Sequence, residues 1–261
     1  MSRSIHPTAV IDAKAELADQ VEIGPYATVG AGVRLAEGVV LHAHAHVAGR
    51  TEIGPETHVF PFAAIGESPQ DQKYRGEDVR LVIGARNHFR EHTTAHPGTV
   101  KGGGITRIGD DNLFMIGAHV AHDCVVGNGV ILANGAMLAG HVSVGDHAVI
   151  QAVAGIQQFL RVGEASFIAG HAGLIQDAPP FCFLQGYPAR VLKLNRIKLE
   201  RLGWDAARIE AVERAFRIVF RSRLAPPAAF ARVREELAGS PDALRLVDFC
   251  EGAERGFARA R

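Results

Sequence analysis

Ile23-Gly-Pro-Tyr-Ala-Thr28 and Ile53-Gly-Pro-Glu-Thr-His58 follow one six-residue plan, in which an aliphatic residue comes first and Gly second. The aliphatic residue recurs every six positions from Ile5 to Ile65, and the fifth position of each unit is usually small or β-branched. The phase resumes at Ile83 after a first interruption, and after a second the repeat restarts at Ile108 and holds to position 174. A period of six fits neither an amphipathic helix nor an alternating strand of ordinary length. It is the signature of a hexapeptide-repeat parallel β-helix.

The repeat also predicts how the chain is wound. Each unit makes one short strand and a turn, and three units close a triangular coil of 18 residues. The first and fifth positions point inward, and successive coils stack at the strand spacing of about 4.8 Å. Proteins with this repeat wind left-handed, against the usual right-handed crossover rule. We therefore predict a mainly β fold, in which residues 1–190 form a left-handed parallel β-helix.

Two segments interrupt the repeat. Residues 66–82 separate Ile65 from Ile83 by one coil length, so the phase survives and the segment is expected to project as a loop. Projecting loops on rigid scaffolds often carry function. Residues 98–107 form a second, glycine-rich loop. A glycine run can cradle phosphate, but this one lacks the strand and helix context of a P-loop, so we interpret it as a turn-forming loop.

Past Pro188 the pattern becomes helical, and residues 191–261 are predicted to form a small α-helical domain that closes one end of the solenoid. The first expected helix contains Leu192, Leu194, Ile197 and Leu199 and ends at Gly203. Asp205 is expected to cap a second helix to about Arg223. A third is expected from Pro226 to near Gly239, and a fourth from Ser240-Pro241 to about residue 255.

Composition and charge limit the classes of function. No run approaches 18 apolar residues and the start of the chain lacks an apolar leader, so no membrane span is expected. The three cysteines show no disulfide or zinc spacing, which favours a reducing cytoplasm. Residues 1–190 carry 13 Lys/Arg and 18 Asp/Glu, and residues 191–261 carry 15 and 10. A net of +5 on the helical segment suggests an acidic partner or phosphorylated ligand more than nucleic acid.

A cluster of polar residues is expected on one edge of the solenoid. The coil length of 18 residues places His122, Gly140 and Gln158 in one column, at the third position of their repeats. His141 lies beside Gly140, Asp123 lies beside His122, and His119 ends the preceding repeat. Cys124 falls on an inward fifth position, which predicts a small core residue and not a nucleophile.

The spacing of these residues along the chain leaves three interpretations of the cluster open. A histidine can act as general base at neutral pH, with Asp123 orienting it. Three histidines can instead hold zinc with an open position, as in the γ-class carbonic anhydrases. Those enzymes, however, place four residues between two of their ligands, whereas His119 and His122 have two between them. Finally, polar residues on a solenoid edge can simply be exposed, and 13 histidines make incidental ones common.

Specific sequence motifs favour one of these interpretations. They are Gln70-Asp-Gln-Lys-Tyr74, Gly98-Thr-Val-Lys-Gly-Gly-Gly104, Asp111-Asn-Leu113, Ala118-His-Val-Ala-His-Asp-Cys124, Ile131-Leu-Ala-Asn134, Leu138-Ala-Gly-His-Val-Ser-Val144 and Gln176-Asp-Ala-Pro-Pro180. In these stretches, and over nearly its full length, the chain resembles the bacterial acyl-[acyl-carrier-protein]–UDP-N-acetylglucosamine O-acyltransferases, which catalyse the first step of lipid A biosynthesis. A generic acetyltransferase would share the hexapeptides but not these loops.

The resemblance implies a separate role for each residue of the cluster. His122 would be the general base on the glucosamine 3-hydroxyl, supported by Asp123, and the N–H of Gly140 would bind the oxyanion. Direct transfer would need no covalent acyl-enzyme. The resemblance also assigns substrate contacts to Asp71, Lys73, His96, His119, His141, Gln158, Asn195 and Arg201. Gly170 matches the family's hydrocarbon-ruler position, where the absence of a side chain predicts room for a long 3-hydroxyacyl group.

The same resemblance implies a homotrimer with active sites between subunits, and no cofactor beyond the phosphopantetheine of the acyl carrier protein. Three positions depart from the common pattern, namely Gln157, Ile197 and Leu202. They affect the expected UDP contacts and not the base. The N-acyltransferase later in the pathway is a close rival, but it carries an extra domain before its repeats, which here begin at Ile5. A binding solenoid without catalysis is the remaining alternative.

Overall fold

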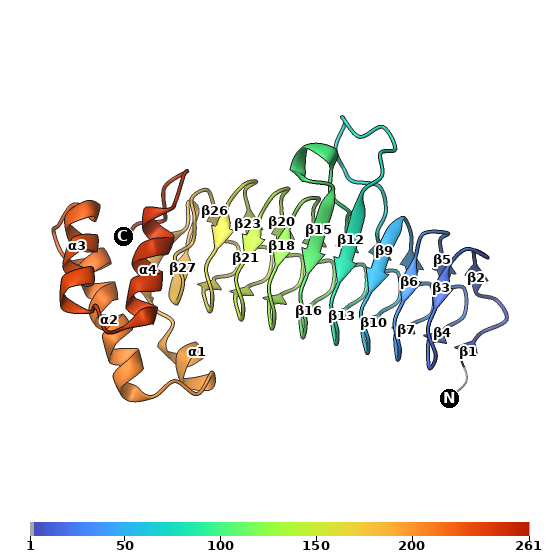
Figure 1. The fold of residues 1–261 in the computed structure, drawn as a ribbon, viewed down its shortest axis with the longest axis horizontal. Coiled ribbons are helices and arrows are strands. Elements are labelled where there is room, and N and C mark those ends of the chain that lie inside the picture. Colours follow the sequence, from blue (N-terminus) through green and yellow to red (C-terminus); the bar gives the residue numbers. More distant parts are fainter. Residues whose placement is uncertain (1–2, 261) are drawn as a thin grey trace.

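The computed structural model describes residues 3–260 and confirms the predicted left-handed parallel β-helix with a helical C-terminal part (Figure 1). Its strands form three parallel sheets, one on each side of the triangular coil. The first sheet contains β1 (Ser4–Ile5), β4 (Glu22–Ile23), β7 (Val40–Leu41), β10 (His58–Val59), β13 (His88–Phe89), β16 (Leu113–Phe114), β19 (Ile131–Leu132), β22 (Val149–Ile150), β25 (Phe167–Ile168), β27 (Cys182–Gln185) and β28 (Arg190–Leu194).

The second sheet contains β2 (Val10–Ile11), β5 (Thr28–Val29), β8 (His46–Val47), β11 (Ala64–Ile65), β14 (Thr94–Ala95), β17 (His119–Val120), β20 (Met137–Leu138), β23 (Gly155–Ile156) and β26 (Gly173–Leu174). The third contains β3 (Glu16–Leu17), β6 (Arg34–Leu35), β9 (Arg50–Ile53), β12 (Arg80–Ile83), β15 (Ile105–Ile108), β18 (Val125–Val126), β21 (Ser143–Val144) and β24 (Arg161–Val162).

The strand register is one coil of 18 residues wherever the repeat is uninterrupted. His119 pairs with Met137, and Met137 pairs with Gly155. At the two interruptions the register spans more of the chain, because Ile53 pairs with Ile83 and Ile83 with Ile108. Each interruption is therefore an excursion from one coil, after which the repeat resumes in its spatial phase.

Both excursions leave the solenoid at the same corner, between the second and third sheets. The first runs from β11 to β12 and the second from β14 to β15. The second contains η1 (Val100–Gly102), and the N–H of Arg80 donates to the carbonyl of Gly104. Figure 1 shows the two loops side by side above β12 and β15. The next turn at this corner, between β17 and β18, holds the histidine cluster.

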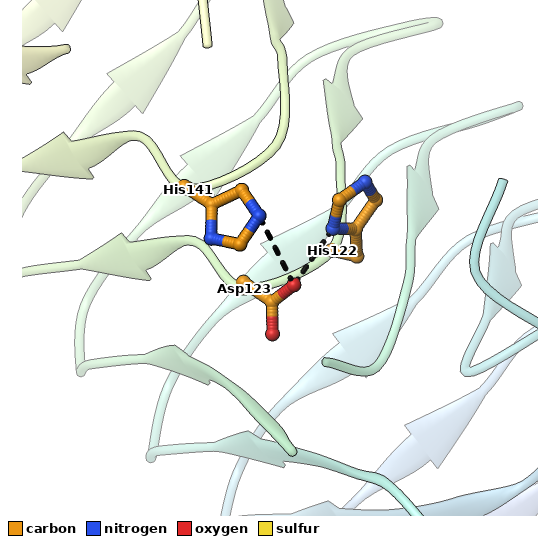
Figure 2. A group of neighbouring side chains, drawn as sticks. All are labelled: His122, Asp123 and His141. Atoms are coloured by element: carbon orange, nitrogen blue, oxygen red, sulfur yellow. Dashed lines mark hydrogen bonds and ion pairs between the residues drawn. The ribbon is translucent and has the colours of Figure 1, made fainter. Parts of the chain in front are cut away.

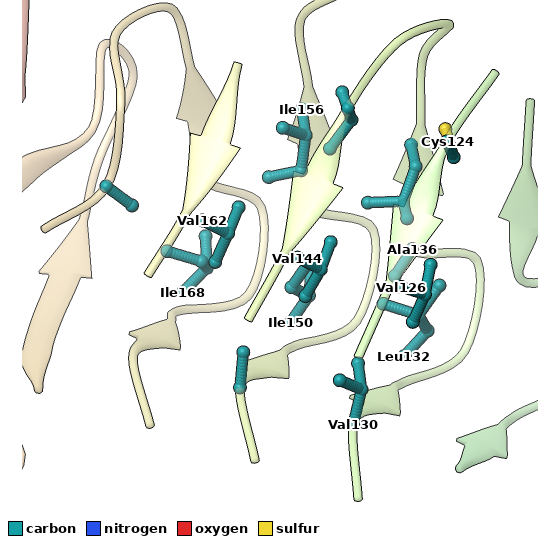
Figure 3. Close-up of a cluster of buried hydrophobic side chains, with 14 of the residues drawn as sticks. Cys124, Val126, Val130, Leu132, Ala136, Val144, Ile150, Ile156, Val162 and Ile168 are labelled. Atoms are coloured by element: carbon teal, nitrogen blue, oxygen red, sulfur yellow. The ribbon is translucent and has the colours of Figure 1, made fainter. Parts of the chain in front are cut away.

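The core follows the first and fifth positions, as predicted. Val126, Leu132 and Val144 are buried first-position residues, and Cys124 and Val130 are fully buried fifth-position residues. Figure 3 shows these side chains stacked in ladders along the solenoid axis. Each aliphatic side chain buried in this way stabilises the fold by about 1.5–3 kcal/mol. The low aromatic content is therefore no obstacle to a continuous dry core.

One expectation for the C-terminal part is wrong. Leu192 and Leu194, expected in the first helix, lie in β28, which pairs antiparallel with β27 and extends the first sheet. Val191 and Leu194 are both buried there, although they are three residues apart, because the register of the β27–β28 pairing shifts between Phe183 and Leu184. Pairing and packing on the first sheet therefore decide this segment. The first helix, α1 (Arg196–Arg201), is correspondingly short.

The remaining helices begin where expected. Asp205 caps α2 (Ala206–Arg221), and its carboxylate accepts from the N–H of Arg208 at 2.8 Å. α3 (Pro226–Glu236) begins with proline, and Ser240 caps α4 (Pro241–Glu251). These helices cover the C-terminal end of the solenoid, opposite the N-terminus (Figure 1). Within residues 3–260 no helix is long and apolar enough to cross a membrane.

Candidate active site

His122 and Asp123 form a hydrogen-bonded pair in the turn between β17 and β18. Nδ1 of His122 lies 2.7 Å from Oδ2 of Asp123. The Asp123 side chain is almost fully buried, whereas the His122 side chain is partly accessible. An ionised carboxylate only accepts hydrogen bonds, so the imidazole proton stays on Nδ1 and the lone pair lies on Nε2. The pair therefore presents a basic nitrogen to solvent and keeps its carboxylate inside.

The glycine-rich loop of residues 98–107 holds the Asp123 carboxylate in place. The N–H and the hydroxyl of Thr99 each donate to it at 2.7 Å, and the Asp123 N–H donates to the Thr106 hydroxyl at 2.8 Å. Buried charges need such partners. A Cβ on Gly102 would lie 2.1 Å from Cγ of Asp123, so the loop approaches this closely only with glycine there. The loop is a turn, as predicted, and its contact with Asp123 is a function that spacing did not indicate.

Gly140 stands directly beside the His122 ring, as the 18-residue column predicted. A Cβ on Gly140 would lie 2.6 Å from Cε1 and 2.8 Å from Nε2 of His122. Only glycine leaves room for the imidazole in this position. Within residues 3–260 the Gly140 N–H has no hydrogen-bond acceptor, whereas its carbonyl accepts from the N–H of Phe159. A free backbone donor thus lies next to the basic nitrogen.

His141 is the third member of the cluster. Its Nε2 lies 3.6 Å from Oδ2 of Asp123, and its ring meets that of His122 edge-on with centroids 5.3 Å apart. Figure 2 shows both imidazoles directed at the one carboxylate. The other face of the His141 ring stacks on Phe159 at 4.3 Å. Burial lowers the pKa of His141 and so favours its neutral form.

His119 and His96 belong to neighbouring strands of the second sheet. His119 lies in β17, and His96 directly follows β14. Burial lowers the pKa of His119 to about 4, and its Nδ1 lies 2.8 Å from the Thr94 hydroxyl. Nδ1 of His96 donates to the carbonyls of Glu67 and Ser68, at 3.0 Å each. Nε2 of His96 is buried and has no partner among residues 3–260. This nitrogen is therefore available to a ligand.

Two hollows adjoin the cluster. A groove of about 750 Å³ follows the second sheet, and its lining includes His119, Met137, Gly155, Gln157 and Tyr187. Its walls are mainly apolar and suit a hydrocarbon chain. A smaller hollow of about 160 Å³ lies between the two loops and is lined by Asp71 and Lys73 together with Thr99 and Lys101.

Gly170, the expected ruler, lies one residue before a wall of the larger groove. His171 and Ala172 line that groove, and a Cβ on Gly170 would meet only the Ala152 carbonyl, at 3.4 Å. A Cβ is therefore accommodated at this position, beside the groove.

Asn195 and Arg201 are not brought to the cluster within one chain. The Asn195 side chain donates to the carbonyl of Ala165 at 2.8 Å and anchors the start of α1. Arg201 lies in the last turn of α1 with Lys198, whose pKa is lowered by burial and by Arg201. Both belong to the C-terminal end of the molecule, at α1 in Figure 1.

The cluster can offer three metal-binding atoms, from His122, Asp123 and His141, within 4.8 Å of one another. The Asp123 oxygen closest to both imidazoles already accepts the His122 hydrogen bond. A cation would have to displace that proton, so the hydrogen bonds seen here fit a base–carboxylate pair better than a dedicated metal site.

The solenoid and this corner define a hexapeptide-repeat acyltransferase. The profile of the bacterial transferase hexapeptide matches residues 105–140, and that of UDP-N-acetylglucosamine O-acyltransferase, domain 2, matches residues 177–258. The chain belongs to the family of acyl-[acyl-carrier-protein]–UDP-N-acetylglucosamine O-acyltransferases.

Two relatives and one solved structure illustrate the similarity on which this family assignment rests. The enzyme of that name from Anaeromyxobacter sp. (strain Fw109-5) is 46% identical over 98% of this chain and 100% of its own length. The one from Myxococcus xanthus (strain DK1622) is 45% identical over 98% and 99%. The crystal structure of the UDP-N-acetylglucosamine acyltransferase from Bacteroides fragilis superposes with a TM-score of 0.95 at 36% identity, over 98% of this chain and 100% of that one.

Proposed function

We propose that this protein transfers a 3-hydroxyacyl group from acyl carrier protein to the 3-hydroxyl of UDP-N-acetylglucosamine, the first step of lipid A biosynthesis. The names of its relatives support the substrates. The observation that carries the mechanism is the His122–Asp123 hydrogen bond beside the unoccupied Gly140 N–H.

In the first step, Nε2 of His122 removes the proton from the sugar hydroxyl as its oxygen attacks the thioester carbonyl. The Asp123 carboxylate stabilises the imidazolium that forms, through the hydrogen bond to Nδ1. Thr99 holds this carboxylate in place, because its N–H and its hydroxyl both donate to it. The base is therefore prepared before the substrates bind.

In the second step, the former carbonyl oxygen, now negatively charged, accepts a hydrogen bond from the Gly140 N–H. The tetrahedral intermediate then collapses: its C–S bond breaks, and the thiolate of phosphopantetheine takes the proton from His122. An ester and a free carrier-protein thiol result. No acyl-enzyme forms, and the chain needs no cofactor beyond the group on the donor.

The surrounding residues fit the remaining parts of such substrates. Neutral His119 and His141 can exchange hydrogen bonds with sugar hydroxyls at no cost in buried charge. The apolar groove takes the acyl chain, and Lys73 in the hollow between the loops offers a cation for an anionic part of donor or acceptor. Gln158 shares the column of His122 and Gly140, and the preceding residue, Gln157, lines the groove.

The direct test replaces His122 by Ala. Loss of the base is expected to lower turnover by about 10²–10⁴-fold, measured by mass spectrometry of the acylated sugar nucleotide. His147→Ala is the matched control, because His147 packs on Gly129 at another corner. Near-normal turnover by His122→Ala would remove the base assignment. Exhaustive chelation is expected to leave wild-type activity intact, and a stoichiometric zinc requirement would favour the metal-dependent alternative.

We further propose that the protein acts as a cytoplasmic homotrimer that completes its sites between subunits. The separation of Asn195 and Arg201 from the cluster within one chain supports this, because a neighbouring subunit can supply them. The net charge of +5 on residues 191–261 suits docking of an acidic carrier protein. Light scattering tests the trimer. Mixed oligomers of His122→Ala and Arg201→Ala chains should regain activity, and failure to do so would place both residues in one subunit's site.

A further inference from the structure

A column of side chains extends from the base–carboxylate pair toward the helical domain. Asp123, His141 and Phe159 occupy the fourth position of corresponding repeats in three successive coils. All three have left-handed backbone conformations, with φ of 61°, 63° and 65°. Because the backbone is the same in each coil, their side chains leave the corner in the same direction. The His141 and Phe159 rings are nearly parallel, at 10°, with centroids 4.3 Å apart.

The C-terminal segment caps this column with Arg255. The Arg255 guanidinium lies over the Phe159 ring, with Cζ 4.9 Å from the centroid, and its Nη1 donates to the carbonyl of Gln158 at 3.5 Å. The next residues fix the segment to the solenoid: the Asp177 N–H donates to the Gly256 carbonyl at 3.0 Å, and the Ala258 N–H donates to the Asp177 carbonyl at 2.8 Å. Arg255 is thus held over the Phe159 end of the column.

The stack matters because His141 competes with His122 for one oxygen. Nε2 of His141 is 3.6 Å from the Asp123 oxygen that His122 bonds at 2.7 Å. A tilt of the His141 ring toward Asp123 would make a second hydrogen bond to that oxygen and weaken the first. A tilt away from Asp123 would move the His141 ring out of its place for the proposed contact with the sugar of the acceptor. The parallel contact with Phe159 opposes both movements, since either would break the stacked geometry.

Burial of the ring favours the neutral form of His141. Asp123 and Asp71 favour a protonated His141, whereas burial, which is the largest influence, and His122 oppose protonation. Phe159 supplies apolar cover on one face of the ring, and the Arg255 cation stands behind it. A protonated His141 would form an ion pair with Asp123 at the expense of the catalytic pair.

We propose that Phe159, clamped by Arg255, is a positioning residue that holds His141 neutral and in place for the sugar nucleotide. This inference rests on the proposed function, and it assigns a role in the site to the C-terminal segment. Neither residue touches the reacting atoms; each acts through His141.

The chain offers a matched control. Tyr26, His44, Phe62 and His92 form a second stacked column on another corner, with neighbouring ring centroids 5.0–5.4 Å apart. Phe62 also has a left-handed backbone, with φ of 62°, and stacks on histidines on both sides. Phe62→Leu therefore removes the same kind of stack at the same backbone conformation, far from the base–carboxylate pair along the chain.

The experiment compares Phe159→Leu, Phe159→Tyr, Arg255→Ala and Phe62→Leu in the full-length protein. Phe159→Leu is expected to raise KM for UDP-N-acetylglucosamine about tenfold, which corresponds to about 1.4 kcal/mol. Its kcat should fall at acidic pH, where His141 becomes protonated. Arg255→Ala should show a smaller change in the same direction, and Phe159→Tyr should restore wild-type behaviour. Phe62→Leu should leave KM and the pH profile unchanged.

A second readout does not depend on transfer activity. NMR titration of the His141 ring should show a higher pKa in Phe159→Leu and Arg255→Ala than in wild type. If wild type transfers no acyl group, the proposed function fails while this comparison still tests the positioning. Arg255 is exposed, so Arg255→Ala keeps the test open if Phe159→Leu fails to fold. An unchanged KM and His141 pKa in Arg255→Ala and in a folded Phe159→Leu would overturn the proposal.

Discussion

Thr99 gives both its N–H and its hydroxyl to the Asp123 carboxylate, each over 2.7 Å. The two residues are 24 positions apart in the chain, and the contact exists because both lie on one corner of successive coils. It connects the glycine-rich loop to the proposed base, because any shift of Thr99 moves the carboxylate that accepts the His122 hydrogen bond. The loop is thus a structural support of the proposed catalytic pair.

Thr99→Val should lower kcat about tenfold or more while KM changes little. A hydrogen bond to a charged group contributes about 1.5–3 kcal/mol, and its loss leaves the buried carboxylate with one fewer donor. Steady-state kinetics of acyl transfer measure the effect. Thr51→Val is the control, because Thr51 is also buried and donates its hydroxyl to the Ala48 carbonyl instead. Equal kinetic losses in both variants would show a general structural effect.

Gly140→Ala should reduce kcat by about 10²-fold. The added Cβ cannot remain 2.6 Å from Cε1 of His122, so the imidazole must move, and small misplacements of a catalytic group cost about this much. Gly239→Ala serves as the control, since a Cβ there meets nothing within 4 Å. Circular dichroism should show both proteins folded. A fully active Gly140→Ala enzyme would contradict the position derived for the base.

Stability should fall as the pH is lowered from about 6.5 toward 4, in part because of His119. Burial lowers the folded-state pKa of His119 to about 4 from an ordinary 6.5. Between these values the unfolded chain binds the proton and the folded protein does not, so protonation favours unfolding. Urea titrations at several pH values should show a weaker pH dependence in His119→Gln. The same dependence as wild type would mean that His119 is not desolvated in solution, and exposed His6→Gln is the reference.

Gly170→Met should shift donor preference toward shorter acyl chains. The position has space for a side chain and adjoins groove-lining His171 and Ala172. A ladder of 3-hydroxyacyl carrier-protein donors measures kcat/KM against chain length. Turnover of short donors should be retained, which distinguishes a shortened groove from a damaged base. An unchanged length profile would remove Gly170 as the ruler.

The amino-acid pattern by itself determined the solenoid, its inward positions and the column of His122, Gly140 and Gln158. Each of these follows from a period of six, which is a local property: once one coil is closed, every later coil repeats its geometry. The same regularity assigned Cys124 to the core, where burial raises the pKa of its thiol to about 12. The identity of the substrates came instead from resemblance.

Tertiary structure alone decided the contacts between segments that the repeat does not relate. Thr99 and Thr106 reach Asp123 because the glycine-rich loop returns to the solenoid at this corner, and loop conformation follows no period. Leu192 lies in a strand because the edge of the first sheet offered hydrogen bonds that outweighed the helical pattern. Arg255 meets Phe159 because a helical domain folds back on the last coil. The repeat determines the conformation within each coil, because it is a local pattern. These contacts instead depend on which distant segments meet when the chain packs.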